Sequence, residues 1–152
     1  MSAYEFDLFS AFTANPFGGS HAGIVYDGAK LPTAQMQQIA REVGAPATCF
    51  LIRVKRCDVH VRFFSTVQEY PMCGHGTLGL MTGLVERGHL EVPLGQTKKV
   101  HLHTSASSAV VQVTHLSNSR IEVMLKLAPA VFEPASLTPD QFKVFFGVSS
   151  QA

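Results

Sequence analysis

A thiol, an imidazole and several glycines lie close together between positions 72 and 80. The segment reads Met-Cys-Gly-His-Gly-Thr-Leu-Gly-Leu, with Cys73 and His75 on either side of Gly74. We interpret it as a turn that runs directly into a helix over residues 74–87, closed by Gly88. Free backbone N–H groups and the positive end of the dipole make a helix N-terminus an anion site. A thiol and an imidazole at that point suggest acid–base chemistry next to a carboxylate.

The same pattern also has a purely structural explanation. Cysteine is among the most often buried residue types, and a single histidine is often only a hydrogen-bonded core residue. A glycine-rich turn before a buried helix is also common. The residues alone therefore leave both interpretations open.

The helix that follows is expected to be buried at the centre of the fold. An all-round apolar helix is buried, and its apolar residues are Leu78, Leu80, Met81, Leu84 and Val85. Gly76, Gly79 and Gly83 share one side, which we call the glycine face. Each glycine costs about 1 kcal/mol relative to alanine in a helix interior. We expect close packing of another element against the glycine face to compensate.

The bulk composition describes one globular domain, or one lobe of something larger. The 152 residues are 46% hydrophobic and 15% charged, with a net charge of +1. Such a charge lacks the basic field that nucleic-acid binding needs, and no apolar run is long enough to span a membrane. The N-terminus has no signal-peptide pattern, and the cysteines have no CxxC spacing. We therefore expect a cytoplasmic protein without nucleic-acid or membrane partners.

Periodicity predicts a strand-rich fold with few helices. The predicted strands are residues 4–9, 22–26, 48–53, 59–64, 99–104, 109–114 and 120–127. An amphipathic helix is expected from Pro32 to Val43, with Gly44 and Pro46 ending it. Ser117-Asn118-Ser119 is the expected turn between the last two strands.

The end of the chain has a different character. Pro129, Pro134 and Ala135 belong to a linker-like passage, and Thr138 opens a short helix with capping-box spacing. The stripe on that helix consists of Phe142, Phe145 and Phe146. We therefore divide the chain into a lobe, residues 1–128, and a linker with a short helix, residues 129–152, that leads toward a second lobe or a partner.

The order and spacing of these segments resemble the phenazine-biosynthesis PhzF-like family of the diaminopimelate epimerase/proline racemase fold. Residues 11–13 with 15–19 are similar to the family's opening, and residues 36–42 to its first helix. Its signature is similar to residues 62–64, then Glu69, then residues 73–78.

The resemblance implies an α+β fold, in which a curved, mostly antiparallel sheet wraps around a central buried helix. Two such lobes enclose the active site between them. It also implies an isomerase or epimerase that moves a proton on a small carboxylated substrate, without metal or organic cofactor. Gly74 and His75 match positions that bind and orient the substrate. Cys73 stands where epimerase and racemase relatives carry an acid–base thiol.

The sequence departs from the family pattern in two ways. The family's proton-moving Glu is replaced by Ala47, within Pro-Ala-Thr-Cys-Phe, and a Gly-Gly-Asn-Pro motif becomes Gly19-Ser20-His21. The chain also ends at about the point where the second lobe is expected to begin. Half of the expected cleft would therefore come from elsewhere.

The candidate catalytic residues are Cys73 and His75. We expect the helix N-terminus and His75 to lower the pKa of the Cys73 thiol and make it the most reactive of the cysteines. The candidate substrate-binding residues are Gly74, Gly76, Thr77, Ser20 and His21. For Thr77 and Ser20 a plain cap or turn role is an equal alternative, and His21 is either a substitute base or an exposed turn residue.

Other polar residues receive structural roles. Glu69 is expected to fix the loop before Cys73 rather than to move protons. His101 and His103 share one strand face, but no third ligand has a suitable spacing, so we expect no metal site. Cys49 and Cys57 are interpreted as structural.

Two principal hypotheses follow. The first is an enzyme lobe that acts on a small carboxylated substrate as a homo-oligomer or with a second-lobe chain. The second, which Ala47 keeps open, is a non-catalytic relative that retains the anion pocket for binding a small molecule or another subunit. A weaker third is an inert fragment of a decayed gene.

Overall fold

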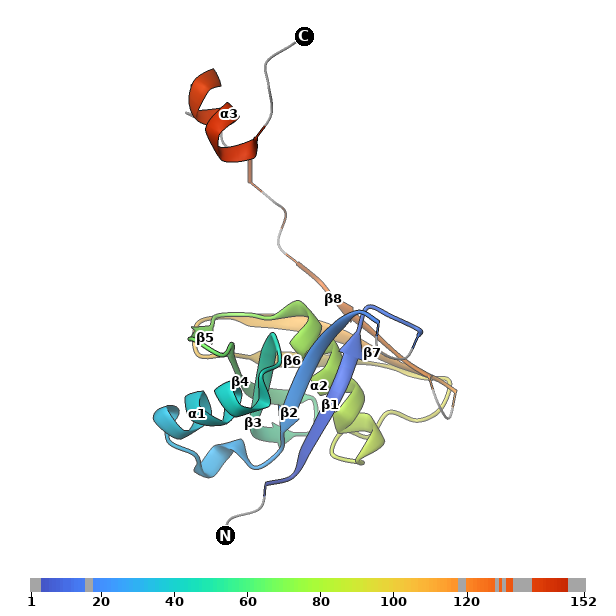
Figure 1. The fold of residues 1–152 in the computed structure, drawn as a ribbon. Coiled ribbons are helices and arrows are strands. Elements are labelled where there is room, and N and C mark those ends of the chain that lie inside the picture. The colour runs from blue at the N-terminus through green and yellow to red at the C-terminus, as the bar shows by residue number, and fades with distance from the viewer. Residues whose placement is uncertain are drawn as a thin grey trace.

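The computed structural model describes residues 4–15, 18–117, 120–127, 129, 131–132 and 138–147. These residues form a curved eight-stranded sheet in the order β1-β2-β3-β4-β6-β7-β8, with β5 paired to β4 (Figure 1). The strands are β1 (Phe6–Ala11), β2 (Ser20–Val25), β3 (Ala47–Lys55), β4 (Asp58–Phe64), β5 (Glu69–Tyr70), β6 (Thr97–His103), β7 (Ser108–Ser117) and β8 (Arg120–Leu125). The helices are α1 (Thr33–Val43), α2 (Gly74–Glu86) and α3 (Pro139–Phe146), with a 3-10 turn η1 (Gly28–Lys30).

The sheet consists of local antiparallel units joined by parallel pairings. β1 pairs with β2, β3 with β4, and β6 with β7 and then β8, all antiparallel. The pairings of β2 with β3 and of β4 with β6 are parallel. Parallel neighbours need a crossover connection, and the helices α1 and α2 lie in those two connections. The predicted mostly antiparallel sheet is confirmed.

The two faces of the sheet pack on different helices. Side chains alternate between faces along a strand. The core on the α2 side includes Ala22, Ile24, Ala47, Cys49, Leu80 and Leu84. The core on the α1 side includes Val25, Met36, Ala40, Phe50 and Phe64. The curved sheet wraps around α2, as expected, while α1 covers the outside.

The glycine face of α2 is the surface on which the sheet packs. A Cβ at Gly76 would lie 2.9 Å from the Cys49 sulfur, and one at Gly79 would lie 3.3 Å from the Cβ of Ala22. A Cβ at Gly83 would overlap the Tyr26 hydroxyl. The expected close packing is therefore confirmed, because the helix backbone itself contacts the strands.

Most predicted elements are present, with shifted ends. β3 runs two residues beyond Arg53, and Pro32 is the N-cap of α1 rather than part of its first turn. Sequence patterns missed η1 and the short strand β5. The expected turn at Asn118 and Ser119, the linker residues Pro134 and Ala135, and Pro16 and Phe17 of the family-like opening lie outside the described residues.

The capping box of α3 is confirmed, because Thr138 and Gln141 exchange hydrogen bonds between side chain and backbone. α3 lies apart from the sheet in Figure 1. Phe142, Phe145 and Phe146 are 47%, 71% and 61% exposed. This helix therefore presents its apolar stripe to solvent. No helix among the described residues has the length and apolar character needed to cross a bilayer.

Candidate active site

The start of α2 leaves backbone donors free. Cys73 is the N-cap, with extended backbone angles of φ −140° and ψ 115°. The first helical hydrogen bond runs from the Thr77 N–H to the Cys73 carbonyl, 2.9 Å away. The N–H groups of residues 74–76 precede that bond and therefore have no partner within the helix. They are suited to bind an anion.

The two candidate catalytic side chains are brought together. The Cys73 sulfur lies 3.4 Å from Nδ1 of His75 and 3.8 Å from its Nε2. Cys73 is 7% exposed, whereas His75 is half-buried. The thiol and the imidazole therefore lie together at the helix start, close enough for one proton to be shared between them.

The protonation states at this site differ from the sequence expectation. Burial raises the pKa of the Cys73 thiol, and the Gly76 N–H offsets only part of that rise. Burial also lowers the pKa of His75. The expected lowering of the Cys73 pKa is wrong, because desolvation of the thiolate outweighs the helix N-terminus. Near neutral pH the pair is a thiol and a neutral imidazole.

The other cysteines occupy different surroundings. Cys49 is fully buried under the helix start, where its sulfur lies 3.4 Å from the Gly76 carbonyl oxygen. Burial raises the pKa of Cys49 well above its ordinary value. Cys57 is half-buried in the turn between β3 and β4. The structural interpretation of Cys49 agrees with this packing.

The remaining residues at the helix start differ in how much free space surrounds them. A Cβ at Gly74 would meet no atom within 4 Å, so this position faces open space. Gly76 is closed by the contact with Cys49. Thr77 is fully buried, and its hydroxyl donates to the Cys73 carbonyl over 2.7 Å. That hydroxyl proton is therefore used within the helix, in a bond to the carbonyl four residues earlier, and Thr77 is not the cap residue, because Cys73 holds the N-cap position.

Ser20 and His21 begin β2 and are both half-buried. Ser20 has the same strand parity as Ala22 and Ile24, which face α2, whereas His21 has the parity of Val25, which faces α1. In the described part of the chain, no hydrogen bond joins either residue to the start of α2.

Ala47 lies on the α2 side of β3, in the same buried cluster as Cys49 and Cys73. It is fully buried and offers only a methyl group. Its neighbour Thr48 is also fully buried, and the Thr48 hydroxyl has no hydrogen-bond partner among the residues that the structure describes. Ala47, at which the resemblance places the family's Glu, therefore faces the helix that carries the thiol but has no ionisable group.

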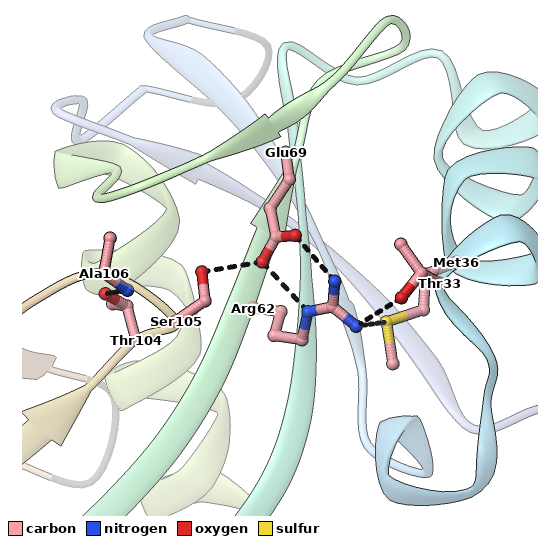
Figure 2. Close-up of polar contacts among 7 residues, drawn as sticks. All are labelled: Thr33, Met36, Arg62, Glu69, Thr104, Ser105 and Ala106. Atoms are coloured by element: carbon pink, nitrogen blue, oxygen red, sulfur yellow. Dashed lines mark hydrogen bonds and ion pairs between the residues drawn. The ribbon is translucent and has the colours of Figure 1, made fainter.

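Glu69 is held by a hydrogen-bond network (Figure 2). Arg62 donates from Nε to Oε1 over 2.9 Å and from Nη2 to Oε2 over 2.6 Å. The hydroxyl of Ser105 donates to Oε1 over 2.9 Å. The hydrogen bonds from Arg62 hold the pKa of Glu69 below its usual value. Glu69 is therefore ionised near neutral pH, and its hydrogen bonds link the loop before Cys73 to β4 and to the β6–β7 turn.

The outer histidines make contacts of a different kind. His103 stacks on His60 with ring centroids 4.6 Å apart, and its Nε2 lies 3.6 Å from Asp58 Oδ1. Across the described ranges, no group of three or more His, Cys, Asp or Glu residues could hold a metal ion.

A groove beside α2 is separate from the thiol. It encloses about 760 Å³ between the edge strands β1 and β8, along the exposed side of α2. Leu78 and Thr82 of α2 line it, but Cys73 and His75 do not. The groove marks the open seam of the curved sheet, whereas the thiol and the imidazole lie at the helix start.

Comparison with known proteins gives one consistent picture. Residues 9–144 match the family described as phenazine biosynthesis-like protein. The chain is 31% identical over 134 residues to the uncharacterized isomerase YfhB of Bacillus subtilis, covering 88% of this chain and 44% of YfhB. It is 33% identical over 82 residues to trans-2,3-dihydro-3-hydroxyanthranilate isomerase of Pseudomonas chlororaphis, covering 53% of this chain and 30% of that enzyme. The chain thus spans less than half the length of these relatives.

Solved structures agree on the fold. A phenazine biosynthesis protein of the PhzF family from Bacillus anthracis superposes with a TM-score of 0.71 at 32% identity, covering 82% of this chain and 40% of that one. A hydroxyproline epimerase from Agrobacterium vitis superposes with a TM-score of 0.58 at 18% identity, covering 73% of this chain and 39% of the epimerase. The expected fold, a lobe of the diaminopimelate epimerase/proline racemase type, is confirmed.

Proposed function

Because the chain belongs to the phenazine biosynthesis-like family, we propose that it supplies one half of an isomerase or epimerase site that moves a proton on a small carboxylated molecule. The observation that carries the proposal is the contact of 3.4 Å between Cys73 and His75 at the start of α2. The N–H groups of residues 74–76, which have no partner within the helix, are the proposed carboxylate site.

The proposed chemistry divides the work between donors and a proton carrier. The N–H groups of Gly74, His75 and Gly76 hold the substrate carboxylate and stabilise negative charge that develops beside it. Cys73, a thiol near neutral pH, gives its proton to the substrate carbon after a base in the other half has removed one. The resulting thiolate accepts a hydrogen bond from His75, and the reverse step returns the proton to sulfur.

The other candidates have supporting roles in this proposal. Thr77 holds the Cys73 carbonyl and so fixes the N-cap. Ser20, with the parity that faces α2, is the favoured contact from β2. His21 has less support, because its parity is that of the opposite face. A relative from Pseudomonas chlororaphis is named for its action on trans-2,3-dihydro-3-hydroxyanthranilate, so a small carboxylated substrate is proposed for this chain.

The second half of the site is proposed to come from outside residues 1–128, either from a second lobe or from another copy of the chain. Support comes from the relatives, which are more than twice the aligned length, and from the exposed phenylalanine stripe of α3. Exposed apolar patches of this kind are typical of interaction sites. Residues 129–152 are then the connection to that half.

The test is incorporation of solvent deuterium into small carboxylated candidates. The parent protein should exchange substrate hydrogen for deuterium slowly, and Cys73→Ser should lower the rate of this exchange by about 10²–10⁴-fold. Ala47→Glu restores the family's base, and Ala47→Gln is its matched control of the same size. Exchange in the parent that survives Cys73→Ser contradicts the proposed role of the thiol.

A second candidate function is a binding module for small carboxylates. It is favoured by Ala47, because a methyl group occupies the position where the family carries its base. If the parent binds carboxylates without any exchange while Ala47→Glu gains exchange, the binding module is the better description.

A further inference from the structure

The segment between β4 and α2, residues 65–73, ends at Cys73, the proposed proton carrier. Polar groups on two sides of this segment make hydrogen bonds to it (Figure 2). On one side, Arg62 grips Glu69 with two parallel hydrogen bonds and donates from Nη1 to Thr33 Oγ1 of α1 over 2.9 Å. On the other side, Ser105 of the β6–β7 turn donates to Glu69. One carboxylate therefore links the segment to α1 and to the β6–β7 turn.

Further hydrogen bonds fasten the same segment. Gln37 of α1 donates to the Ser65 carbonyl over 2.9 Å, and Arg41 donates to the Thr66 carbonyl over 3.2 Å. In the β6–β7 turn, the Ser107 hydroxyl donates to the Pro71 carbonyl over 3.4 Å. Donors from α1 and from the β6–β7 turn thus bind a short stretch of backbone that ends two residues before Cys73.

We propose that Arg62 and Glu69 are positioning residues for Cys73, which fix this segment and thereby hold the thiol buried against the imidazole of His75. The importance of the Arg62–Glu69 pair for catalysis rests on the proposed function, but the effect of the pair on the Cys73 thiol does not. Both Glu69 oxygens accept hydrogen bonds from Arg62 or Ser105, and the proposal therefore assigns this carboxylate a positioning role and leaves the proton transfer to Cys73.

The geometry makes the two residues sensitive to small changes. A bidentate arginine–carboxylate pair fixes orientation as well as distance, which a lysine at the same position does not reproduce. Displacement of a reacting group by about 1 Å is enough to cost roughly 10²-fold in rate. Only 7% of Cys73 is exposed, so loosening of the segment also admits water to the sulfur.

The test measures the thiol itself. Alkylation of Cys73 by iodoacetamide is followed against pH by mass mapping, with the half-buried Cys57 as an internal reference. In Glu69→Gln and Arg62→Lys we expect Cys73 to react at least about fivefold faster near neutral pH, with its profile shifted to lower pH, because thiolate formation no longer carries the burial penalty. The rate of Cys57 should not change.

The matched control is Asp7→Asn, which breaks another bidentate pair, with Arg87, beyond the opposite end of α2. Asp7→Asn should leave the Cys73 profile within about twofold of the parent. If Glu69→Gln does not fold, as judged by circular dichroism, Ser105→Ala removes one hydrogen bond to Glu69 and should give a smaller shift in the same direction.

Two results overturn the proposal: an unchanged Cys73 profile in the folded variants, or an equal change in Asp7→Asn, which indicates general loosening. A parent without exchange on any carboxylated substrate contradicts the proposed function and leaves the alkylation result standing. Where exchange is present, the variants should lower kcat more than they raise KM.

Discussion

An arginine–carboxylate pair lies near each end of α2. The two ends differ in whether the terminal backbone groups of the helix have hydrogen-bond partners. Beyond the C-terminal end, Arg87 binds Asp7 over 2.6 Å and 2.8 Å, and the Tyr26 hydroxyl donates to Asp7 over 2.9 Å. The last helical carbonyls accept from Arg87, Gly88 and Leu90. At the N-terminal end, the corresponding pair holds only the approach segment, and the first N–H groups are left without helical partners.

This difference separates structural polar groups from functional ones. At the C-terminal end, each named donor meets an acceptor, which is what a buried or half-buried network needs for stability. At the N-terminal end, a thiol and an imidazole lie beside free donors. The incomplete end is therefore the end where a ligand is expected.

The largest expected effect uses two histidines, one near each end of α2. His75→Asn should lower deuterium exchange by about 10²–10³-fold, because it removes the imidazole that stabilises the Cys73 thiolate. His89→Asn is the matched control: His89 lies 5.6 Å from the Tyr26 ring, at the C-terminal end. His89→Asn should leave exchange unchanged, and equal losses in both variants would remove the functional distinction between the two ends.

A smaller effect compares two glycines at the same end. Gly76→Ala should lower the free energy of unfolding by about 1–3 kcal/mol, because its methyl overlaps Cys49 and Phe63 in the core. Gly74→Ala should change it by less than about 0.5 kcal/mol, because its methyl enters open space. Urea denaturation measures both, and similar values for the two variants would contradict the described helix contacts. Gly74→Ala should still weaken carboxylate binding.

The smallest effect concerns acid pH. Arg62 and Arg87 lower the folded-state pKa values of Glu69 and Asp7 below their unfolded values. The unfolded state therefore takes up protons first, so this contribution is present above about pH 4 and is lost as the pH falls through the folded pKa values. Urea titrations should show that Glu69→Gln and Asp7→Asn each flatten the acid limb. If the stability of a variant falls with pH as steeply as that of the parent, the ion pair changed in that variant contributes nothing to the acid dependence.

Local patterns predicted most of the fold because they depend on near neighbours. Strand alternation, the glycine face and the capping box at Thr138 are all short-range signals, and each has its counterpart in the structure. The contact of Cys73 with His75 was also predictable, since one residue separates them. The link from Glu69 to Ser105 was not, because the two residues are 36 positions apart and only the sheet topology brings them together.

The direction of the Cys73 pKa shift was predicted wrongly for a related reason. A helix N-terminus can be recognised in the sequence, whereas the depth of burial of a side chain depends on packing by distant strands. Ala47 illustrates the same limit, because only the structure shows that its methyl group is fully buried on the α2 side.

The pairing pattern of the sheet also sets the order in which the chain can fold. The units β1–β2, β3–β4 and β6–β7–β8 pair strands that are adjacent in sequence, so each closes a short loop at a small entropic cost. The parallel pairings require the crossovers through α1 and α2, and such non-local contacts form slowly. Hairpins should therefore form before α2 is enclosed. Changes at the glycine face should then mainly accelerate unfolding, with little effect on the rate of folding.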